Sequence, residues 1–380
     1  MDLSLFYFAN DSGIAENDRY RLLLEGARLA DENGFHAVWT PERHFHPFGG
    51  LYPNPSVTSA AIASITSRIK IRAGSVVAPL HHPLRIAEEW SVVDNISRGR
   101  VGVSFASGWH ATDFALNPSA YTDRRTEMFE RVEQVRALWR GEAIKVADGT
   151  GNPAEVRSFP PPVQAELPVW ISSVGDVETF RTAGRTGAGL LTHLLGQSPA
   201  QMAEKIAEYR KAAAEAGPDG WQGHVVVMVH TFLGQDTEVV REQVRPSLTD
   251  YLRSSLGLIL ASDHSSGSLE PDEIDSLVER SFEHYFDNVG LLGSVDKGEE
   301  VVARLAELGV DEIACLIDFG LPTDEVLSGL TYLKQLRDVC GAGDSQGPDA
   351  VGRGGGSRVD AHVDPGDHAT GTTVSRTAHP

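Results

Sequence analysis

The sequence is poor in cysteine and in positive charge, and it lacks long apolar runs. Its 380 residues include two cysteines, and 33 Lys and Arg stand against 53 Asp and Glu, a formal net charge of −20. Two cysteines are too few for a secreted disulfide framework, so we predict a reducing, cytoplasmic location. The negative field, with no Lys/Arg run, argues against nucleic acid as a partner. No apolar run approaches the ~18 residues that span a bilayer, and the N-terminus lacks the basic start of a signal peptide.

A Gly-x-Gly-x-x-Gly fingerprint after a strand is also absent, which argues against a doubly wound sheet and against direct NAD(P)H binding. Short apolar segments instead alternate with segments of helical periodicity. We predict strands at 3–8, 36–39, 69–77, 101–106, 168–172, 189–193, 225–232 and 312–317. Eight strand–helix alternations predict an α/β fold, a (β/α)₈ barrel with insertions, over residues 1–340.

Three segments do not fit the barrel pattern. Residues 142–167 contain Gly149, Gly151 and a Pro-Pro-Pro run, so we expect an irregular surface excursion. Residues 261–270 are small and polar, and we expect a mobile lid there. From Gly341 onward the chain is rich in Gly, Ser, Asp and His and has almost no large apolar residues. Such a composition cannot offset the entropy of ordering, so we predict a disordered tail at 341–380.

Active sites of barrels are built where strands end, so these positions are the candidates for chemistry. The predicted strand ends carry Glu42, Arg43, His44 and His46; Ser107, Trp109 and His110; Ser172, Ser173 and Gly175; Thr192 and His193; and Asp318. In addition, Arg124 and Arg125 begin a helix, where the helix dipole disfavours cations unless an anion is bound.

Two functional classes fit these residues. Histidines at several strand ends, with Asp318, could ligate a metal, and His44-Phe45-His46 offers the His-x-His pattern of metal-dependent barrel hydrolases. Alternatively, arginines and backbone N–H groups could hold the phosphate of a cofactor while aromatic side chains enclose its ring. The residue pattern by itself leaves both classes open.

Several motifs recur in order along the chain. Residues 34–45 read Gly-Phe-His-Ala-Val-Trp-Thr-Pro-Glu-Arg-His-Phe, and Asn54-Pro55 follows; residues 82–85 read His-Pro-Leu-Arg, and residues 94–100 read Asp-Asn-Ile-Ser-Arg-Gly-Arg. They resemble the Gly-Phe-x-x-x-Trp-x-x-Glu-His-His-Phe, His-Pro-x-Arg and Asp-x-x-Ser-x-Gly-Arg segments of the bacterial luciferase-like monooxygenases. The phrases at 106–110 and 315–320 look most like the subgroup found in polyketide and nonribosomal-peptide biosynthesis.

This resemblance implies a TIM barrel, usually a homodimer, that uses reduced FMN and O₂ to transfer one oxygen atom through a C4a-peroxyflavin. Because no dinucleotide fingerprint is present, reduced FMN should come from a separate flavin reductase. The substrate implied is a natural-product intermediate, free or bound to a carrier protein. Hydroxylation is the default outcome, and Baeyer–Villiger oxidation or N-oxidation would leave the same signature. A deazaflavin-dependent oxidoreductase and a non-catalytic flavin-binding paralogue remain rivals within the fold.

The resemblance also assigns site residues. The residues expected at the flavin are Trp39, Glu42, Asn54, Ser75, Val76, Ser107, Gly108, Arg125, Val174, Gly175, Thr192 and His193. Arg125 matches the family's phosphate-binding arginine, whereas a second such arginine is replaced by Ser107. The catalytic histidine of luciferase is replaced by Arg43. We therefore expect His44 or His110 to exchange protons near the reacting oxygen, with Arg43 supplying positive charge.

Overall fold

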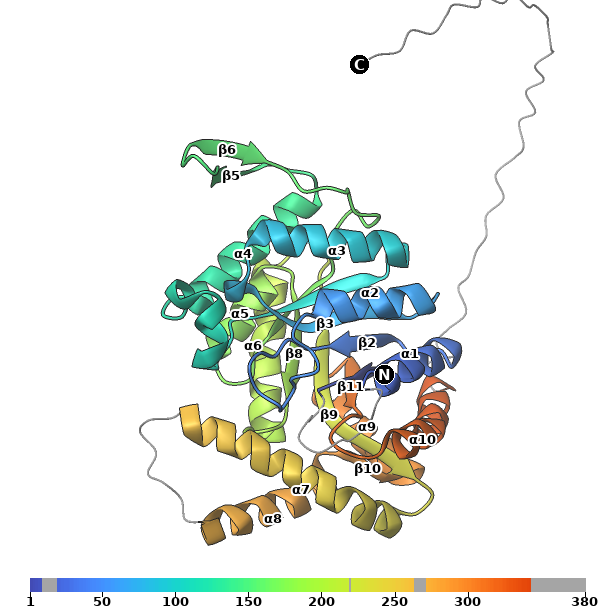
Figure 1. Ribbon diagram of the computed structural model, residues 1–380. Coiled ribbons are helices and arrows are strands. Elements are labelled where there is room, and N and C mark those ends of the chain that lie inside the picture. The colour runs from blue at the N-terminus through green and yellow to red at the C-terminus, as the bar shows by residue number, and fades with distance from the viewer. Residues whose placement is uncertain (9–18, 219, 263–270, 343–380) are drawn as a thin grey trace, which may run out of the picture. The chain divides into compact units, whose positions relative to one another are not determined.

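Parallel strands form a closed barrel at the centre of the molecule (Figure 1). The computed structural model describes residues 1–8, 19–218, 220–262 and 271–342, which lie in one compact unit. The ring order is β1-β2-β3-β4-β7-β8-β9-β11, and β11 pairs with β1 to close it. The strands are Asp2–Phe6 (β1), Ala37–Thr40 (β2), Lys70–Val77 (β3), Val101–Ala106 (β4), Val169–Ser172 (β7), Gly189–His193 (β8), Val225–Gly234 (β9) and Glu312–Leu316 (β11). The predicted (β/α)₈ barrel is therefore confirmed.

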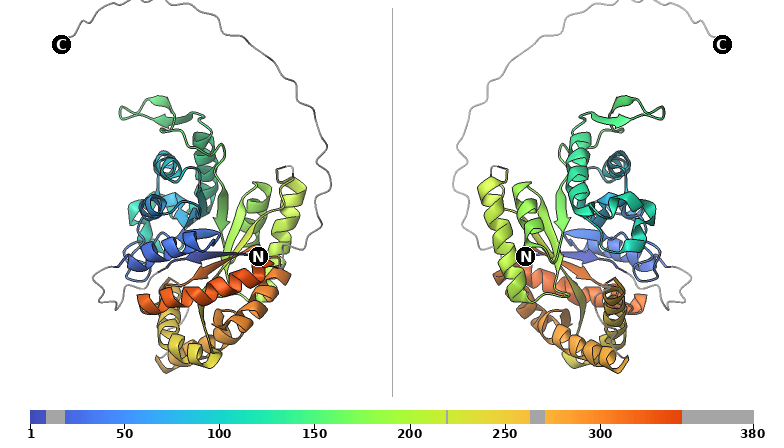
Figure 2. Two further views of the ribbon diagram at one scale, coloured as in Figure 1. Left: turned by 90° about the vertical axis from the view of Figure 1, so that its right-hand side faces the viewer. Right: turned by 90° about the vertical axis from the view of Figure 1, so that its left-hand side faces the viewer.

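Helices lie around the outside of this ring (Figure 2). They are Arg21–Glu32 (α1), Pro55–Ile65 (α2), Pro83–Ser97 (α3), Arg124–Trp139 (α4), Val177–Arg185 (α5), Pro199–Ala216 (α6), Thr237–Ser262 (α7), Pro271–Asn288 (α8), Val295–Glu307 (α9) and Thr323–Ala342 (α10). Their predicted starts hold at α2 and α6, where Asn54 and Ser198 cap the backbone N–H groups and Pro occupies the first helical position. None of the helices among the described residues is both long and apolar enough to cross a membrane.

Two strand elements differ from the prediction. Leu291–Ser294 (β10) pairs with the end of β9, and its four residues were too few to be recognised from periodicity. The segment at 142–167, which was expected to be irregular, contains an antiparallel hairpin of Ile144–Ala147 (β5) and Pro153–Val156 (β6) that projects from the barrel (Figure 1). Of the predicted lid, residues 263–270 lie outside the described residues, and so does the predicted tail from residue 343 onward.

A buried polar network fills the barrel near the N-terminal ends of its strands. The Glu312 carboxylate, 0% exposed, accepts hydrogen bonds from the Ser4 hydroxyl, from Trp39 Nε1 at 2.9 Å and from Arg72 Nη1 at 2.7 Å. The Arg72 guanidinium lies over the rings of Trp39 and Trp170, 4.8 and 4.4 Å from their centroids. These contacts occupy this end of the barrel, so the opposite end, where the strands finish, is left for chemistry.

Candidate active site

A carboxylate with two histidines lies just beyond the end of β2. Glu42 Oε1 is 2.7 Å from His44 Nε2 and 2.5 Å from His81 Nε2, and its Oε2 accepts a hydrogen bond from the backbone N–H of Val77 at 2.7 Å. Glu42 and His44 are buried, while His81 is partly buried. Burial would raise the pKa of Glu42, but the hydrogen bonds from His44 and His81 outweigh it and hold that pKa below its usual value.

This arrangement decides the protonation of both histidine rings. An ionised Glu42 can only accept, so His44 and His81 must each carry a hydrogen on Nε2. For His81, burial lowers the pKa, but the hydrogen bond to Glu42 more than compensates and raises it. The nitrogen of His44 that remains able to take or give a proton is therefore Nδ1.

Arg43, which follows Glu42 in the chain, is the centre of a second cluster of charged and aromatic side chains. Arg43 Nη1 lies 3.1 Å from Asp113 Oδ2, and the guanidinium carbon lies 5.2 Å from the centroid of the Trp109 ring. His110 Nδ1 faces Asp113 Oδ1 at 3.5 Å, too far for a hydrogen bond, and both atoms are buried without a hydrogen-bond partner. The ends of β2 and β4 thus bring the predicted Arg43 and His110 together, with Asp113 between them.

The end of β3 contributes Ser75, which follows a cis peptide bond at Gly74-Ser75. Its hydroxyl hydrogen-bonds to Ser172 and lies 3.3 Å from the Ser104 hydroxyl, and Ser104 and Ser172 are 2.9 Å apart. The three serines come from β3, β4 and β7, so this cluster joins three neighbouring strands of the ring. It places Ser75 at the end of the barrel where Glu42 and Arg43 also lie.

The predicted phosphate-binding residues lie at the starts of α4, which carries Arg125, and α5, which Val174 and Gly175 precede. Arg125, whose side chain is 63% exposed, forms an ion pair with Asp176 at 2.7 Å. Asp176 caps α5 by accepting from the backbone N–H of Glu178. Gly175 is exposed, with open space around it, while the Val174 carbonyl accepts from Lys205 Nζ at 2.6 Å.

The end of β8 brings Thr192 and His193 into a network with Gln197. Gln197 Nε2 donates to Thr192 Oγ1 at 3.2 Å and to the His193 carbonyl, while its Oε1 accepts from Lys205. Burial lowers the pKa of His193 to about 4, so this ring is neutral at physiological pH. Both residues therefore contribute neutral polar groups, connected through Lys205 to the loop that carries Val174.

Other predicted residues have structural partners. Trp39 is fully buried: its Nε1 donates to Glu312 in the network near the N-terminal strand ends, while its ring also packs against Gly74, next to Ser75. Asn54 Oδ1 caps α2. Gly108 has a φ of +74°, and a Cβ there would lie 2.8 Å from Val77 Cγ1, so only glycine fits. Ser107 is partly buried beside it.

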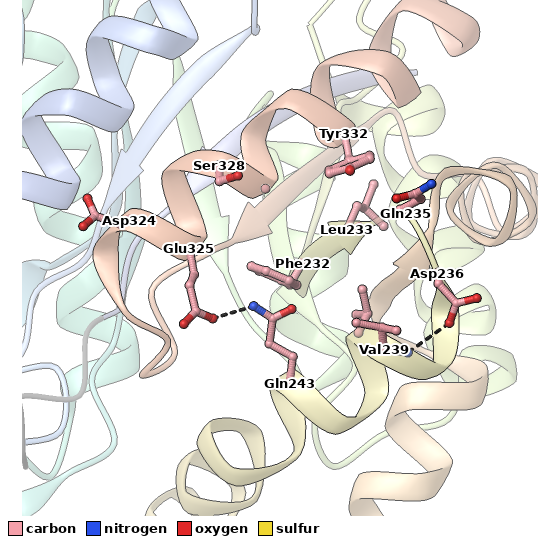
Figure 3. A pocket seen from close by; sticks show the side chains of 13 residues that line it. Phe232, Leu233, Gln235, Asp236, Val239, Gln243, Asp324, Glu325, Ser328 and Tyr332 are labelled. Atoms are coloured by element: carbon pink, nitrogen blue, oxygen red, sulfur yellow. Dashed lines mark hydrogen bonds between the residues drawn. The ribbon is translucent and has the colours of Figure 1, made fainter.

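One small hollow lies beside Glu42, and a larger one lies away from the predicted site. A pocket of about 20 Å³, room for one water, lies beside Glu42 and is lined also by Asn54, Val76 and His81. A larger pocket of about 460 Å³ lies between the end of β9 and the starts of α7 and α10 (Figure 3). Gln243 hydrogen-bonds to Glu325 across it, and none of the predicted site residues lines it.

Sequence reasoning missed two groups at this end of the barrel. His81 was overlooked although it stands directly before the His82-Pro83 motif. His230 was read as part of an apolar strand; it is fully buried, and burial lowers its pKa to about 3. Asp318 was recognised as a strand-end residue, but its burial, which raises the pKa of its carboxyl to about 8, required the structure.

The metal interpretation can be compared with this geometry. His44 and His46 do not belong to one group of possible metal ligands among the described residues. His46 instead accepts a hydrogen bond at Nδ1 from the backbone N–H of Phe48. Within the described residues, one group of three has ligand atoms within 4.8 Å of one another, namely Glu42, His44 and His81. In this group the Nε2 atoms of His44 and His81 both hydrogen-bond to Glu42.

The residues at the starts of α4 and α5 offer the types of hydrogen-bond donor that hold the phosphate of a cofactor. Arg125 supplies an exposed guanidinium, and Gly175 leaves its backbone N–H approachable. Asp176 is the one unfavourable group, because its negative charge competes with a phosphate for Arg125. The site therefore suits a phosphate that displaces the Asp176 carboxylate from Arg125.

Known proteins are similar to this chain in sequence and in fold. A model of the luciferase-like monooxygenase family matches residues 1–311. The oxygenase component of the flavin-dependent trigonelline monooxygenase of Acinetobacter baylyi is 23% identical over 312 residues, which cover 80% of this chain and 84% of that protein.

Solved structures agree with the fold. Monooxygenase RslO1 from Streptomyces bottropensis has a TM-score of 0.73 at 24% identity and covers 88% of this chain and 98% of its own. The oxygenating constituent of 3,6-diketocamphane monooxygenase from Pseudomonas putida, in complex with FMN, has a TM-score of 0.67 at 17% identity, with 88% and 97% covered. An F420-dependent secondary alcohol dehydrogenase shares the fold at a TM-score of 0.64 and 18% identity, with 88% and 97% covered.

Proposed function

The chain belongs to the luciferase-like monooxygenase family, and from this premise we propose that it is the oxygenase component of a two-component system that uses reduced FMN and O₂. A separate flavin reductase would supply the reduced FMN, as the name of the trigonelline relative suggests for that protein. The observation that carries the proposal is the convergence of Glu42, His44, Arg43 and His110 at one end of the barrel.

Each group has a role in this proposal. Arg125 and the backbone N–H groups of Val174 and Gly175 would hold the cofactor phosphate, while Ser75, Val76, Ser107, Gly108, Thr192 and His193 would surround the rest of it. When bound, reduced flavin supplies the electrons that activate O₂. His44 would exchange a proton at Nδ1 because Glu42 fixes the hydrogen on Nε2. Arg43 would contribute positive charge, and His110 is the alternative proton donor.

The substrate that we propose is a natural-product intermediate, supported by the resemblance of the motifs at 106–110 and 315–320. FMN is favoured over F420 because the trigonelline relative is named flavin-dependent, and F420 remains the rival cofactor because a structure of the same fold uses it. A homodimer is supported by exposed apolar side chains on two adjacent helices, Val57 on α2 with Val92 and Ile96 on α3. A content of two cysteines in 380 residues, too few for a disulfide framework, supports a reducing, cytoplasmic location.

One experiment tests the cofactor and the reaction class. The purified protein is mixed with reduced FMN under air in a stopped-flow spectrometer, and the same mixing is repeated with reduced F420. A transient absorbance that belongs neither to reduced nor to oxidised FMN, and that is absent without protein, would support the proposal. Hydride transfer from reduced F420 to an added carbonyl compound, which is reduced to the alcohol, would favour the dehydrogenase instead.

A metal-dependent hydrolase is the second candidate, because Glu42, His44 and His81 cluster as metal ligands could. Elemental analysis of the same preparation decides between the two. A stoichiometric metal without flavin binding would replace the monooxygenase proposal with the hydrolase. Light scattering during gel filtration measures the mass of the assembly and would contradict the dimer if it returned that of a single chain.

A further inference from the structure

One edge of the Arg43 guanidinium has no partner. Arg43 is 3% exposed, and its Nη1 is paired with Asp113, but its Nε and Nη2 are buried and have no hydrogen-bond partner within the described chain. In arginine, Nε–H and Nη2–H lie on the same side of the planar group and point in parallel. This is the edge that binds the two oxygens of a carboxylate side-on.

Buried charged groups are expected to have their hydrogen-bonding positions filled, so an open edge calls for an explanation. The surroundings leave this edge of Arg43 open. His46 lies close enough that burial, and then the charges of Arg43 and His110, lower its pKa. Asp113 pairs with Arg43 through Nη1 and turns its Oδ1 to His110. A carboxylate at the open edge would give the two buried N–H groups one acceptor oxygen each.

A half-exposed aromatic ring covers the Arg43 guanidinium. The Trp109 ring lies on the guanidinium, is 49% exposed and belongs to the loop that follows β4. An aromatic ring in this position could turn away from Arg43 and then lie against the apolar part of a ligand.

The geometry points to a carboxylate subsite: Arg43 binds a carboxylate of the substrate through Nε and Nη2, and Trp109 covers the bound group. This inference rests on the proposed function, since it narrows the substrate to an organic acid. It adds to the positive charge proposed for Arg43 a role in choosing and orienting the substrate. No chemistry at the cofactor is required for the carboxylate to bind.

The test measures equilibrium binding to the full chain without flavin, so it is independent of whether the monooxygenase proposal holds. Acetate, hexanoate and benzoate are each compared with the corresponding primary amide at constant ionic strength, by calorimetry and by tryptophan fluorescence. Arg43→Met removes the subsite, and Arg43→Lys keeps the positive charge but loses the two parallel N–H donors. Arg245→Met is the matched control, because Arg245 also lies over an aromatic ring, that of Phe282, but its Nη1 and Nη2 pair with Glu279 and Glu283.

We expect at least one carboxylate to bind at least tenfold more tightly than its amide, with a fluorescence change that Trp109→Phe abolishes. Arg43→Met should remove this preference, Arg43→Lys should weaken carboxylate binding at least tenfold, and Arg245→Met should leave it unchanged. Equal binding of acids and amides, a preference retained in Arg43→Met, or carboxylate binding as tight in Arg43→Lys as in the unaltered protein would overturn the inference. If Arg43→Met fails to fold, as judged by circular dichroism, Arg43→Lys decides the question.

Discussion

Replacing Glu312 by Gln should strongly destabilise the barrel. The carboxylate of Glu312 is fully buried and accepts hydrogen bonds from Ser4, Trp39 and Arg72. Glutamine has nearly the same shape but no charge, and one of its two terminal atoms is a donor that cannot accept. The substitution therefore leaves the Arg72 guanidinium buried without its partner charge.

The size of the effect follows from the environment of the carboxylate. Burial would raise the pKa of Glu312, but Arg72, His36 and His224 lower it from 4.5 to about 2. At about 1.4 kcal/mol for each pKa unit, ionised Glu312 contributes roughly 3 kcal/mol to folding at neutral pH. Breaking a buried ion pair by removing one partner costs about 3–5 kcal/mol, in agreement. Because the folded pKa is the lower one, this stabilisation is complete above about pH 4.5 and is lost as pH falls through 2.

Guanidinium denaturation followed by circular dichroism at pH 7 measures the loss. Glu300→Gln, at an exposed position of α9, is the matched control and should change the free energy of unfolding by less than about 0.5 kcal/mol. Adding Arg72→Met to Glu312→Gln should restore part of the loss, because no unpaired charge is then buried. A loss below about 1 kcal/mol for Glu312→Gln would refute the reasoning, since the network would then carry little of the stability.

Three further predictions concern the opposite end of the barrel. Burial raises the pKa of Asp318 to about 8, so the free energy of unfolding should fall as pH rises from about 4 to 8. Asp318→Asn should reduce this fall. Denaturation at pH 5 and pH 8 measures it, and an equal change in the variant and the unaltered protein would contradict the prediction. His44→Ala should lower product formation about 10²-fold or more without weakening FMN binding, and unchanged turnover in this variant and in His110→Ala would refute both as proton donors. Arg125→Met should weaken FMN binding at least tenfold while unfolding changes by less than about 1 kcal/mol, because its ion pair is exposed; Asp176→Asn should tighten FMN binding, and a fluorescence titration that shows neither change would exclude this phosphate site.

Local sequence signals predicted the architecture because they act over a few residues. Apolar runs and helical periodicity located the strands of the barrel ring, and Asn54-Pro55 and Ser198-Pro199 located two helix starts through hydrogen bonds within one turn. The same signals failed for β10 and for the β5–β6 hairpin. β10 is short, and the hairpin residues are exposed or only half-buried, so neither produces a long apolar pattern.

The sequence by itself determined the barrel and the family to which the motifs point, and it named the strand ends whose residues are the candidates for chemistry. Tertiary structure decided which side chains meet, because closing the ring joins residues that are far apart in the chain. Glu42 meets His81 because β2 pairs with β3, and Arg43 meets Asp113 because β3 in turn pairs with β4. Tertiary structure also decided that Trp39 reaches toward Glu312. A side chain that points into a barrel can turn toward either end, and the hydrogen bond to Glu312 fixes the direction of Trp39.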